Sequence, residues 1–119
     1  MNHFTDLLVW KVGIELLQEI YEITKLLPTE ERFGITKQMR KAASSILANL
    51  AEGFGRFTYP DKAAKYTISR GECSEEEAFL LIIVALKFVP QARIAKAMDL
   101  VLQEKRLLSG LITACRERE

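Results

Sequence analysis

The chain has few of the residues on which most enzyme chemistry depends. Its 119 residues include one histidine, two cysteines and three prolines. Because His3 is the single histidine and lies near the N-terminus, a Ser-His-Asp or Cys-His arrangement has no well-placed base. The Glu-x-x-His pairs of di-iron bundles are missing as well. We therefore expect neither an enzyme nor a metal or cofactor site.

An excess of charge of one sign is also missing. Lysine and arginine number 17 and the acidic residues 16, which gives a formal charge of +1. Bulk charge therefore gives no reason to expect nucleic-acid binding, and a basic surface would have to be local. Cys73 and Cys115 lie far apart outside any CxxC pattern. That spacing is typical of a reducing compartment, with two small apolar fillers instead of a disulfide.

Targeting and membrane-spanning segments are not apparent. The first ten residues, MNHFTDLLVW, lack the basic start, the apolar core and the cleavage site of a secretory signal. No apolar run approaches the roughly 20 residues of a membrane span. We expect a cytoplasmic protein with no membrane partner, folded as one domain over residues 1–119.

Prolines and glycines divide the chain into segments with helical periodicity. Thr5 and Thr36 are plausible N-caps, and Pro60 and Pro90 can stand in the first turn of a helix. The glycines of GFG tolerate a left-handed backbone that would end the second helix. The predicted helices cover residues 5–27, 36–54, 60–88 and 91–116. No strand pattern occurs, so we predict an all-α, antiparallel up-and-down four-helix bundle.

The first and fourth predicted helices each have a core stripe with spacings of three and four residues. In the first helix the stripe comprises Leu7, Trp10, Ile14, Leu17, Tyr21 and Thr24. In the fourth it comprises Ile94, Met98, Val101, Leu108, Ile112 and Cys115, interrupted by Lys105.

The third helix carries more apolar residues than one stripe needs. Nine consecutive apolar residues, AFLLIIVAL, cover positions 78–86 and make that part of the helix apolar on all sides. A lone bundle would leave some of them exposed, which indicates a surface for another subunit. Alternatively, the first helix or a terminal segment covers them within the chain. The candidate interface residues are Phe79, Leu80, Ile82, Ile83 and Leu86.

The second helix has two distinct faces. Its predicted core face comprises Met39, Ala43, Ile46, Leu47, Leu50 and Phe54. A polar seam on another face comprises Gln38, Ser45, Asn49, Glu52 and Arg56, in which Glu52 and Arg56 have the favourable order for a helical ion pair. We interpret this seam as a polar contact with another helix or another subunit. The alternatives are a solvated face and a ligand or catalytic site.

Several segments together resemble the four helix bundle protein family, also called the intervening-sequence or ribosomal-RNA insertion protein family. These segments are FTDLLVWK, YEITKLLPTEERFGITKQMRKAASSILANLAEGFGR and YTISRGECSEEEA. The resemblance covers residues 4 to about 90. Its most specific residues are Gln38, Arg40, Ala42, Ala43, Ser45, Ile46, Asn49, Ala51, Glu52, Gly53 and Arg56.

The resemblance implies a small helical bundle that assembles into a cyclic homopentamer around a central channel. Members are often encoded within insertions in large-subunit ribosomal RNA genes, which does not imply a structural place in the ribosome. The fold also resembles the accessory protein of diversity-generating retroelements, which has a nucleic-acid and reverse-transcriptase partner. Those relatives are expected to be markedly basic, whereas this chain has a formal charge of +1.

The third helix departs from the family pattern. Where the family reads Gly-Ser-Leu-Ser-Glu-Leu-Glu, residues 71–77 read Gly-Glu-Cys-Ser-Glu-Glu-Glu and add two acids. This change makes a nucleic-acid surface there less favourable. We interpret the acids as a solvated helix face, because a hard metal ion needs carboxylates from several segments. They are Glu72, Glu75, Glu76 and Glu77.

Basic residues around the second helix are the candidate nucleic-acid site. They are Lys37, Arg40, Lys41, Arg56, Lys62, Lys65 and Arg70, with Phe57, Tyr59 and Tyr66 as candidates for base stacking. Cyclic symmetry would bring copies of these cations to one rim. The leading hypothesis is a non-enzymatic accessory or scaffold oligomer that contacts structured RNA or DNA, or a protein that handles it. The alternative is a protein-protein assembly module without nucleic-acid affinity.

Overall fold

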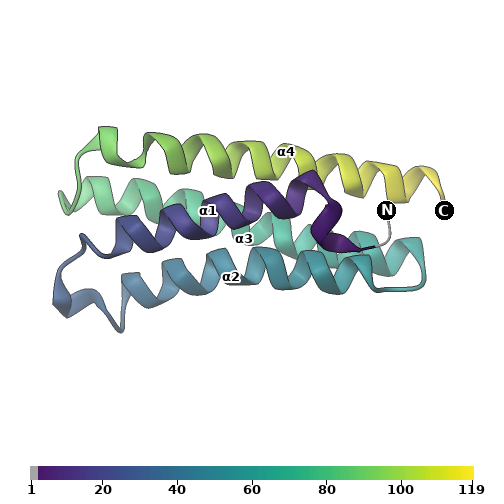
Figure 1. The fold of residues 1–119 in the computed structure, drawn as a ribbon, viewed down its shortest axis with the longest axis horizontal. Coiled ribbons are helices and arrows are strands. Elements are labelled where there is room, and N and C mark those ends of the chain that lie inside the picture. The colour runs from purple at the N-terminus through teal and green to yellow at the C-terminus, as the bar shows by residue number, and fades with distance from the viewer. Residues whose placement is uncertain (1–2) are drawn as a thin grey trace.

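The computed structural model describes residues 3–119, and these residues form four long helices without a strand (Figure 1). The all-α class predicted from the sequence is therefore confirmed. Three short 3-10 turns, Phe4–Asp6, Thr29–Glu31 and Gln91–Ile94, stand next to the helices. The helices are α1 (Leu8–Thr24), α2 (Ile35–Phe54), α3 (Tyr59–Ala85) and α4 (Ala95–Glu117).

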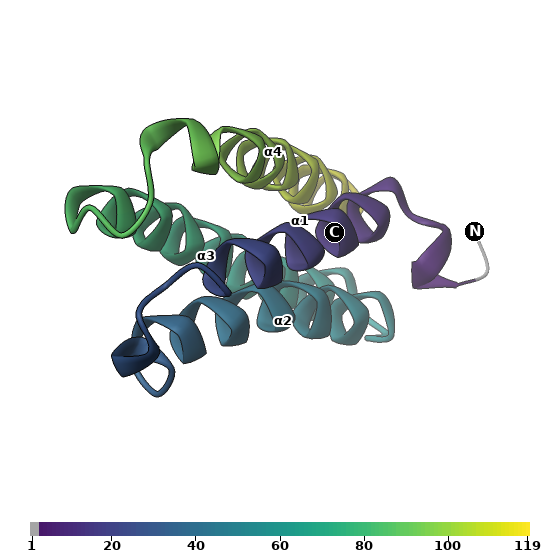
Figure 2. The same cartoon turned by 60° about the vertical axis from the view of Figure 1, so that its left-hand side comes forward.

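The helices lie along one long axis, and each contacts two others. In Figure 1, α1 and α3 run toward one end of the molecule, while α2 and α4 return toward the end where α1 begins. Contacts join α1 to α2, α2 to α3, α3 to α4 and α4 back to α1. Both Figure 1 and the turned view in Figure 2 show α1 between α2 and α4. The resulting body measures 46 × 24 × 21 Å.

The boundaries of α3 follow from local chemistry. The Thr58 hydroxyl oxygen accepts a hydrogen bond from the backbone N–H of Asp61 at 3.2 Å, and Pro60 stands in the first turn as predicted. The helix ends at Ala85, and Lys87 adopts a left-handed backbone with a φ of 63°. Because that conformation stops the helix, Phe88 lies outside it. Pro90 begins a 3-10 turn, and α4 starts after that turn.

Three of the predicted boundary residues have other roles. Thr5 lies inside the first 3-10 turn, which the His3 side chain caps. Thr36 is buried within α2, whose N-cap position is Gly34. No described glycine has a positive φ, so the predicted left-handed end of α2 is wrong. Gly53 is needed for packing instead, because a Cβ atom there would lie 2.6 Å from Cε1 of Tyr66.

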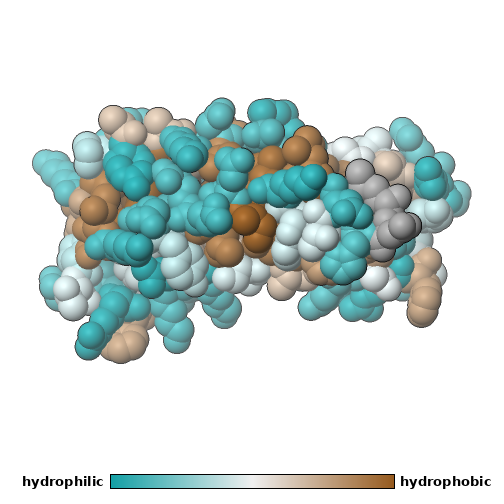
Figure 3. All heavy atoms as spheres, viewed as in Figure 1, coloured by the Kyte–Doolittle hydropathy of each residue, from teal (hydrophilic) through white to brown (hydrophobic). Residues whose placement is uncertain are grey.

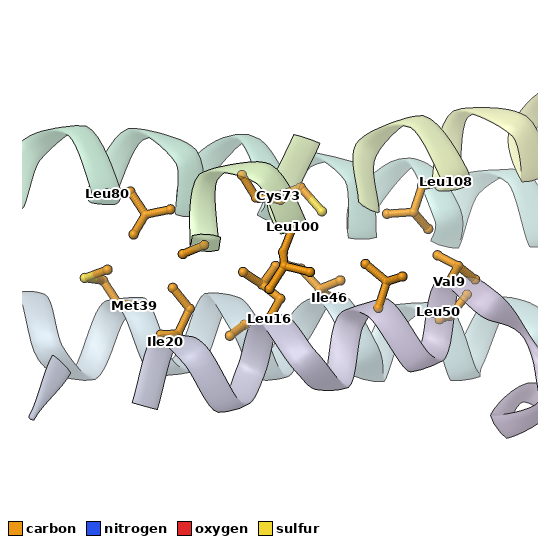
Figure 4. Close-up of a cluster of buried hydrophobic side chains, with 14 of the residues drawn as sticks. Val9, Leu16, Ile20, Met39, Ile46, Leu50, Cys73, Leu80, Leu100 and Leu108 are labelled. Atoms are coloured by element: carbon orange, nitrogen blue, oxygen red, sulfur yellow. The ribbon is translucent and has the colours of Figure 1, made fainter. Parts of the chain in front are cut away.

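Buried apolar side chains from all four helices form the core, and Figure 4 shows part of it. The predicted core face of α2 is confirmed, except that Phe54 is half-buried. The predicted stripe of α1 is right in part: Thr24 is buried and Trp10 and Leu17 pack against the core, but Tyr21 remains 40% exposed because the helix is apolar on more than one face. The α1 residues that face the core are Val9, Val12, Leu16, Ile20 and Ile23.

In α4, the predicted stripe is buried apart from Met98, which is half-buried. Cys73 and Cys115 are both buried with free thiols, as the sequence predicts.

Polar contacts fix neighbouring helices against each other. The buried Ser69 hydroxyl of α3 donates to the Ile46 carbonyl oxygen of α2 at 2.7 Å. The guanidinium of Arg93, just before α4, donates to a Glu19 carboxylate oxygen of α1 at 2.8 Å. Hydrophilic side chains predominate on the face shown in Figure 3, with apolar ones showing between them. Within residues 3–119, no helix has both the length and the apolar character that crossing a bilayer would require.

Candidate functional site

The side of α3 that points away from the bundle is poor in charge. With a helical period of 3.6 residues, its members fall within an arc of about 100°. All eight are exposed, and Ile68, Ile82 and Leu86 expose 47%, 41% and 50% of their surface. Glu75 is the single charged member. This outer face of α3 comprises Ala64, Ile68, Gly71, Glu75, Ala78, Ile82, Ala85 and Leu86.

The predicted interface residues of α3 do not all share that face. Leu80 and Ile83 are completely buried in the chain's own core, so they are not available to a partner, and the prediction that they belong to the interface is wrong. Phe79 is half-buried against the core, and Ile82 and Leu86 are exposed. The expectation that one bundle cannot cover the whole apolar run holds, because a helix buries only the arc that faces its neighbours.

The polar seam of α2 lies at the edge that meets α3. Ser45 and Asn49 are half-buried, and the Asn49 side-chain amide donates to the Ser45 carbonyl oxygen at 2.9 Å. The carboxylate of Glu52 binds the Lys65 ammonium of α3 at 2.8 Å, so its ion-pair partner is not Arg56. Lys65 lowers the pKa of Glu52. Gln38 and Arg56, at the two ends of the seam, are exposed.

The seven candidate cations do not form one patch. Lys37 and Arg56 are 19 positions apart on and just after α2, which places them about 28 Å apart along the axis. Lys37, Arg40 and Lys41 therefore belong to one end of the bundle. At the other end are Arg56, Lys62 and Lys65, while Arg70 turns toward α4.

Four of these cations already have partners within the chain. The Arg40 guanidinium lies over the Tyr21 ring and donates to the Thr24 hydroxyl at 2.9 Å. Lys65 pairs with Glu52 as described. The other two contacts run from Lys62 to the Phe54 carbonyl oxygen at 2.6 Å and from Arg70 to the Ser109 hydroxyl at 3.2 Å. These contacts leave Lys37, Lys41 and Arg56 as the candidate cations for which no hydrogen bond or ion pair is seen within residues 3–119.

The turn between α2 and α3 displays an aromatic ring beside a cation. Phe57 is fully exposed, and its neighbour Arg56 is exposed as well. Tyr59 is partly exposed beneath the Arg118 guanidinium. Tyr66 belongs to the core, and burial raises its pKa to about 12. Of the three predicted stacking residues, Phe57 is the one that solvent reaches fully.

Two buried glutamates are the most unusual polar groups of the described chain. Glu76 of α3 and Glu104 of α4 have no exposed surface, and none of their four carboxyl oxygens has a hydrogen-bond partner. Burial raises the pKa of Glu76 to about 9, with added repulsion from Glu75 and Glu72, and raises that of Glu104 to about 8. Both acids are therefore neutral at pH 7.

The sequence interpretation missed both acids. The run of acids predicts a solvated position for Glu76, as for Glu72, Glu75 and Glu77, but Glu76 is buried. It shares the buried arc of α3 with Cys73 and Leu80, which lie three residues before and four after it. Glu104 lies seven residues after the buried Ala97. A spacing of seven residues places both on the same face of α4, and this spacing is the sequence signal for the burial of Glu104.

Both acids lie in the interior of the bundle, and both act on the thiol of Cys73. Burial and the nearby Glu104 carboxyl raise the pKa of the Cys73 thiol well above its usual range. His3 lies at the surface near the N-terminus, where its ring contacts Thr5. Within residues 3–119, no three side chains of the kinds that bind metals come together.

Comparison with known proteins identifies a family and a solved structure with the same fold. The sequence matches the family described as "23S rRNA-intervening sequence protein" over residues 5–110. A crystal structure of a protein of unknown function from the S23 ribosomal protein family of Bacteroides thetaiotaomicron superposes with a TM-score of 0.81 at 23% identity. That alignment covers 88% of this chain and 98% of the other, and at this identity it shows a shared fold. Comparison with curated proteins gave no match.

Proposed function

Because the chain belongs to the 23S rRNA-intervening sequence protein family, we propose that it is a non-enzymatic assembly module that associates with copies of itself. The observation that carries this proposal is the outer face of α3, where eight exposed residues include one charge. A soluble monomer rarely exposes a contiguous apolar surface of this kind. The protein works in the cytoplasm without a cofactor.

The assembly is a closed ring of antiparallel, up-and-down bundles. When an interface joins two different surfaces of the subunit, a closed ring covers both surfaces on every copy. An open arrangement would leave one apolar face uncovered at its end. Five copies are the number that the family resemblance implies. The small side chains Ala64, Gly71, Ala78 and Ala85 let a neighbouring backbone approach α3 closely.

Light scattering coupled to size-exclusion chromatography tests this proposal. The wild-type mass should be a multiple of the 13.5 kDa chain mass, near five chains. Ile82→Glu should lower the mass toward one chain without loss of helical circular dichroism, because Ile82 lies outside the core. Leu26→Glu is the matched control, since Leu26 is also exposed but belongs to the segment after α1. A wild-type mass of one chain at micromolar concentration would contradict the proposal.

A second candidate function is contact with structured RNA or DNA, and the exposed pair Arg56 and Phe57 favours it. An arginine beside a free aromatic ring can bind a phosphate and stack on an unpaired base. A ring would repeat this turn once per subunit along one rim, so that a modest charge per chain adds up. The partner would then be structured RNA, DNA or a protein that handles them.

Fluorescence anisotropy separates the two functions. A structured ribosomal RNA fragment and a DNA duplex are titrated with the protein at several salt concentrations. Submicromolar binding that weakens steeply with salt, and that Arg56→Glu reduces, would support nucleic-acid contact. Lys96→Glu is the control, because Lys96 is exposed on the first turn of α4. Absence of binding at low salt would leave a purely protein-protein assembly module.

A further inference from the structure

A cleft of about 400 Å³ opens at the end of the bundle where α2 ends and α3 begins. It lies between the first turns of α3 and the last turns of α4. Its walls are mostly apolar and include Phe54, Leu111, Ala114 and the ring of Tyr66. Binding clefts for small molecules have this size and this composition, with a few polar groups that orient the ligand.

Both charged residues that line the cleft are cations, Lys62 and Arg118. The Lys62 ammonium donates one hydrogen bond to the Phe54 carbonyl oxygen at 2.6 Å, which leaves two of its three N–H groups. The Arg118 guanidinium donates to the Tyr59 hydroxyl at 3.3 Å and lies over the Tyr59 ring. Because a guanidinium has five N–H groups, Arg118 retains several donors for a ligand.

The field of these cations reaches into the cleft. Burial raises the pKa of the Cys115 thiol, which lines the cleft, and both Lys62 and Arg118 oppose that rise. Glu119 is the acid that acts on the same thiol, and it does not line the cleft. An apolar interior with two cations and no carboxylate in its lining favours a ligand with a negative group.

We propose that this cleft binds a small organic anion that has an aromatic or branched apolar body and one carboxylate. The body fills the space between Phe54, Tyr66 and Leu111, while the carboxylate accepts hydrogen bonds from Lys62 and Arg118. This site does not depend on the assembly through α3 or on nucleic-acid contact.

Three naphthalene probes of nearly equal size test the charge preference by calorimetry at low salt. They are 2-naphthoate, the neutral 2-naphthamide and the cation 2-naphthylmethylammonium. Naphthoate should bind at least tenfold more tightly than the ammonium compound. In ¹⁵N-labelled protein, naphthoate should shift the amide signals of Tyr59 and Ala114. Equal affinity for the three probes, or shifts confined to the outer face of α3, would overturn the proposal.

Two pairs of variants locate the site. Arg118→Gln should weaken naphthoate binding about tenfold, the usual loss for a hydrogen bond to a charged group. Arg116→Gln, an exposed neighbour that does not line the cleft, should leave the affinity unchanged. Ala114→Phe should abolish binding by filling the cleft, whereas Thr113→Phe on the exposed side of α4 should not. Circular dichroism checks that each variant is folded. Unchanged binding by both Arg118→Gln and Ala114→Phe would refute the site.

Discussion

The carboxyl group of Glu104 occupies the space that a side chain at Gly13 would need. A Cβ atom added to Gly13 would lie 2.6 Å from Oε2 of Glu104 and 2.7 Å from Cδ2 of Leu47. The missing side chain in α1 therefore allows α4 to place a long polar residue in the core. This relation explains why a helix interior retains a glycine, which normally destabilises a helix.

Gly13→Ala should lower the free energy of unfolding by about 1–3 kcal/mol, because the added methyl group overpacks a filled site. Urea denaturation measures the change. Gly110→Ala is the control: a Cβ atom there meets nothing within 4 Å. That variant should gain about 0.5–1 kcal/mol from the better helix propensity of alanine. Equal effects at the two glycines would show that Gly13 is not confined by its neighbours.

The buried acids should make the protein less stable as the pH rises. Each folded-state pKa, about 9 for Glu76 and about 8 for Glu104, lies above the ordinary value of 4.5. Above pH 4.5 the unfolded chain releases protons that the folded chain retains, so the free energy of unfolding falls until the folded-state pKa is passed. One pKa unit corresponds to about 1.4 kcal/mol. Each acid therefore makes the free energy of unfolding at pH 7 about 3 kcal/mol lower than it is below pH 4.5.

Glu76→Leu checks this prediction by urea denaturation at pH 5, 7 and 8.5. The variant should be more stable than the wild type at pH 7, and its stability should depend less on pH over this range. Glu15→Gln is the control, because Glu15 is an exposed acid of α1. If Glu76→Leu had the same pH dependence as the wild type, the Glu76 carboxyl would not be the group that titrates.

Ser69→Ala should lower the free energy of unfolding by about 1 kcal/mol. It removes the buried hydrogen bond to the Ile46 carbonyl oxygen that joins α3 to α2. Thermal unfolding followed by circular dichroism measures the loss. Ser74→Ala, on the exposed side of α3, should change little. A Ser69→Ala variant as stable as the wild type would mean that this contact contributes nothing in solution.

Thr58→Ala should lower the free energy of unfolding by about 1 kcal/mol as well, because Thr58 caps the N-terminus of α3. Thr113→Ala, at an exposed position near the C-terminal end of α4, serves as the comparison. The difference in urea midpoint between the two variants measures the contribution of the capping hydrogen bond to stability. A loss of equal size in both variants would argue against a specific role for the Thr58 hydroxyl.

The sequence predicts the helices well where proline and apolar spacing act together. Pro60 lies in the first turn of α3, and Met39, Ile46 and Leu50 face the core as their spacing indicates. In α1, however, the spacing predicts a stripe through Trp10 and Tyr21 and not the buried one, because both faces of that helix carry apolar residues. Which face lies inward depends on the positions of α2 and α4, and these are not visible in α1 alone.

The candidate site was less predictable for a related reason. Glutamate is almost never fully buried without a partner, so the natural expectation for Glu76 and Glu104 is a solvated position. The burial of Glu104 depends on Gly13, which is distant in sequence. Similarly, Lys62 and Arg118 are 56 positions apart, and the folded bundle brings them to one cleft.

The exposed turn around Arg56 and Phe57 also marks where the chain can be divided into halves. A protease that cleaves after arginine or phenylalanine has open access there, whereas the flanking helices protect most other sites. Cleavage would yield two hairpins, α1 with α2 and α3 with α4, which still share the contacts between α2 and α3 and between α1 and α4. Two peptides made separately should therefore recombine into the bundle, which makes this fold a natural basis for fragment complementation.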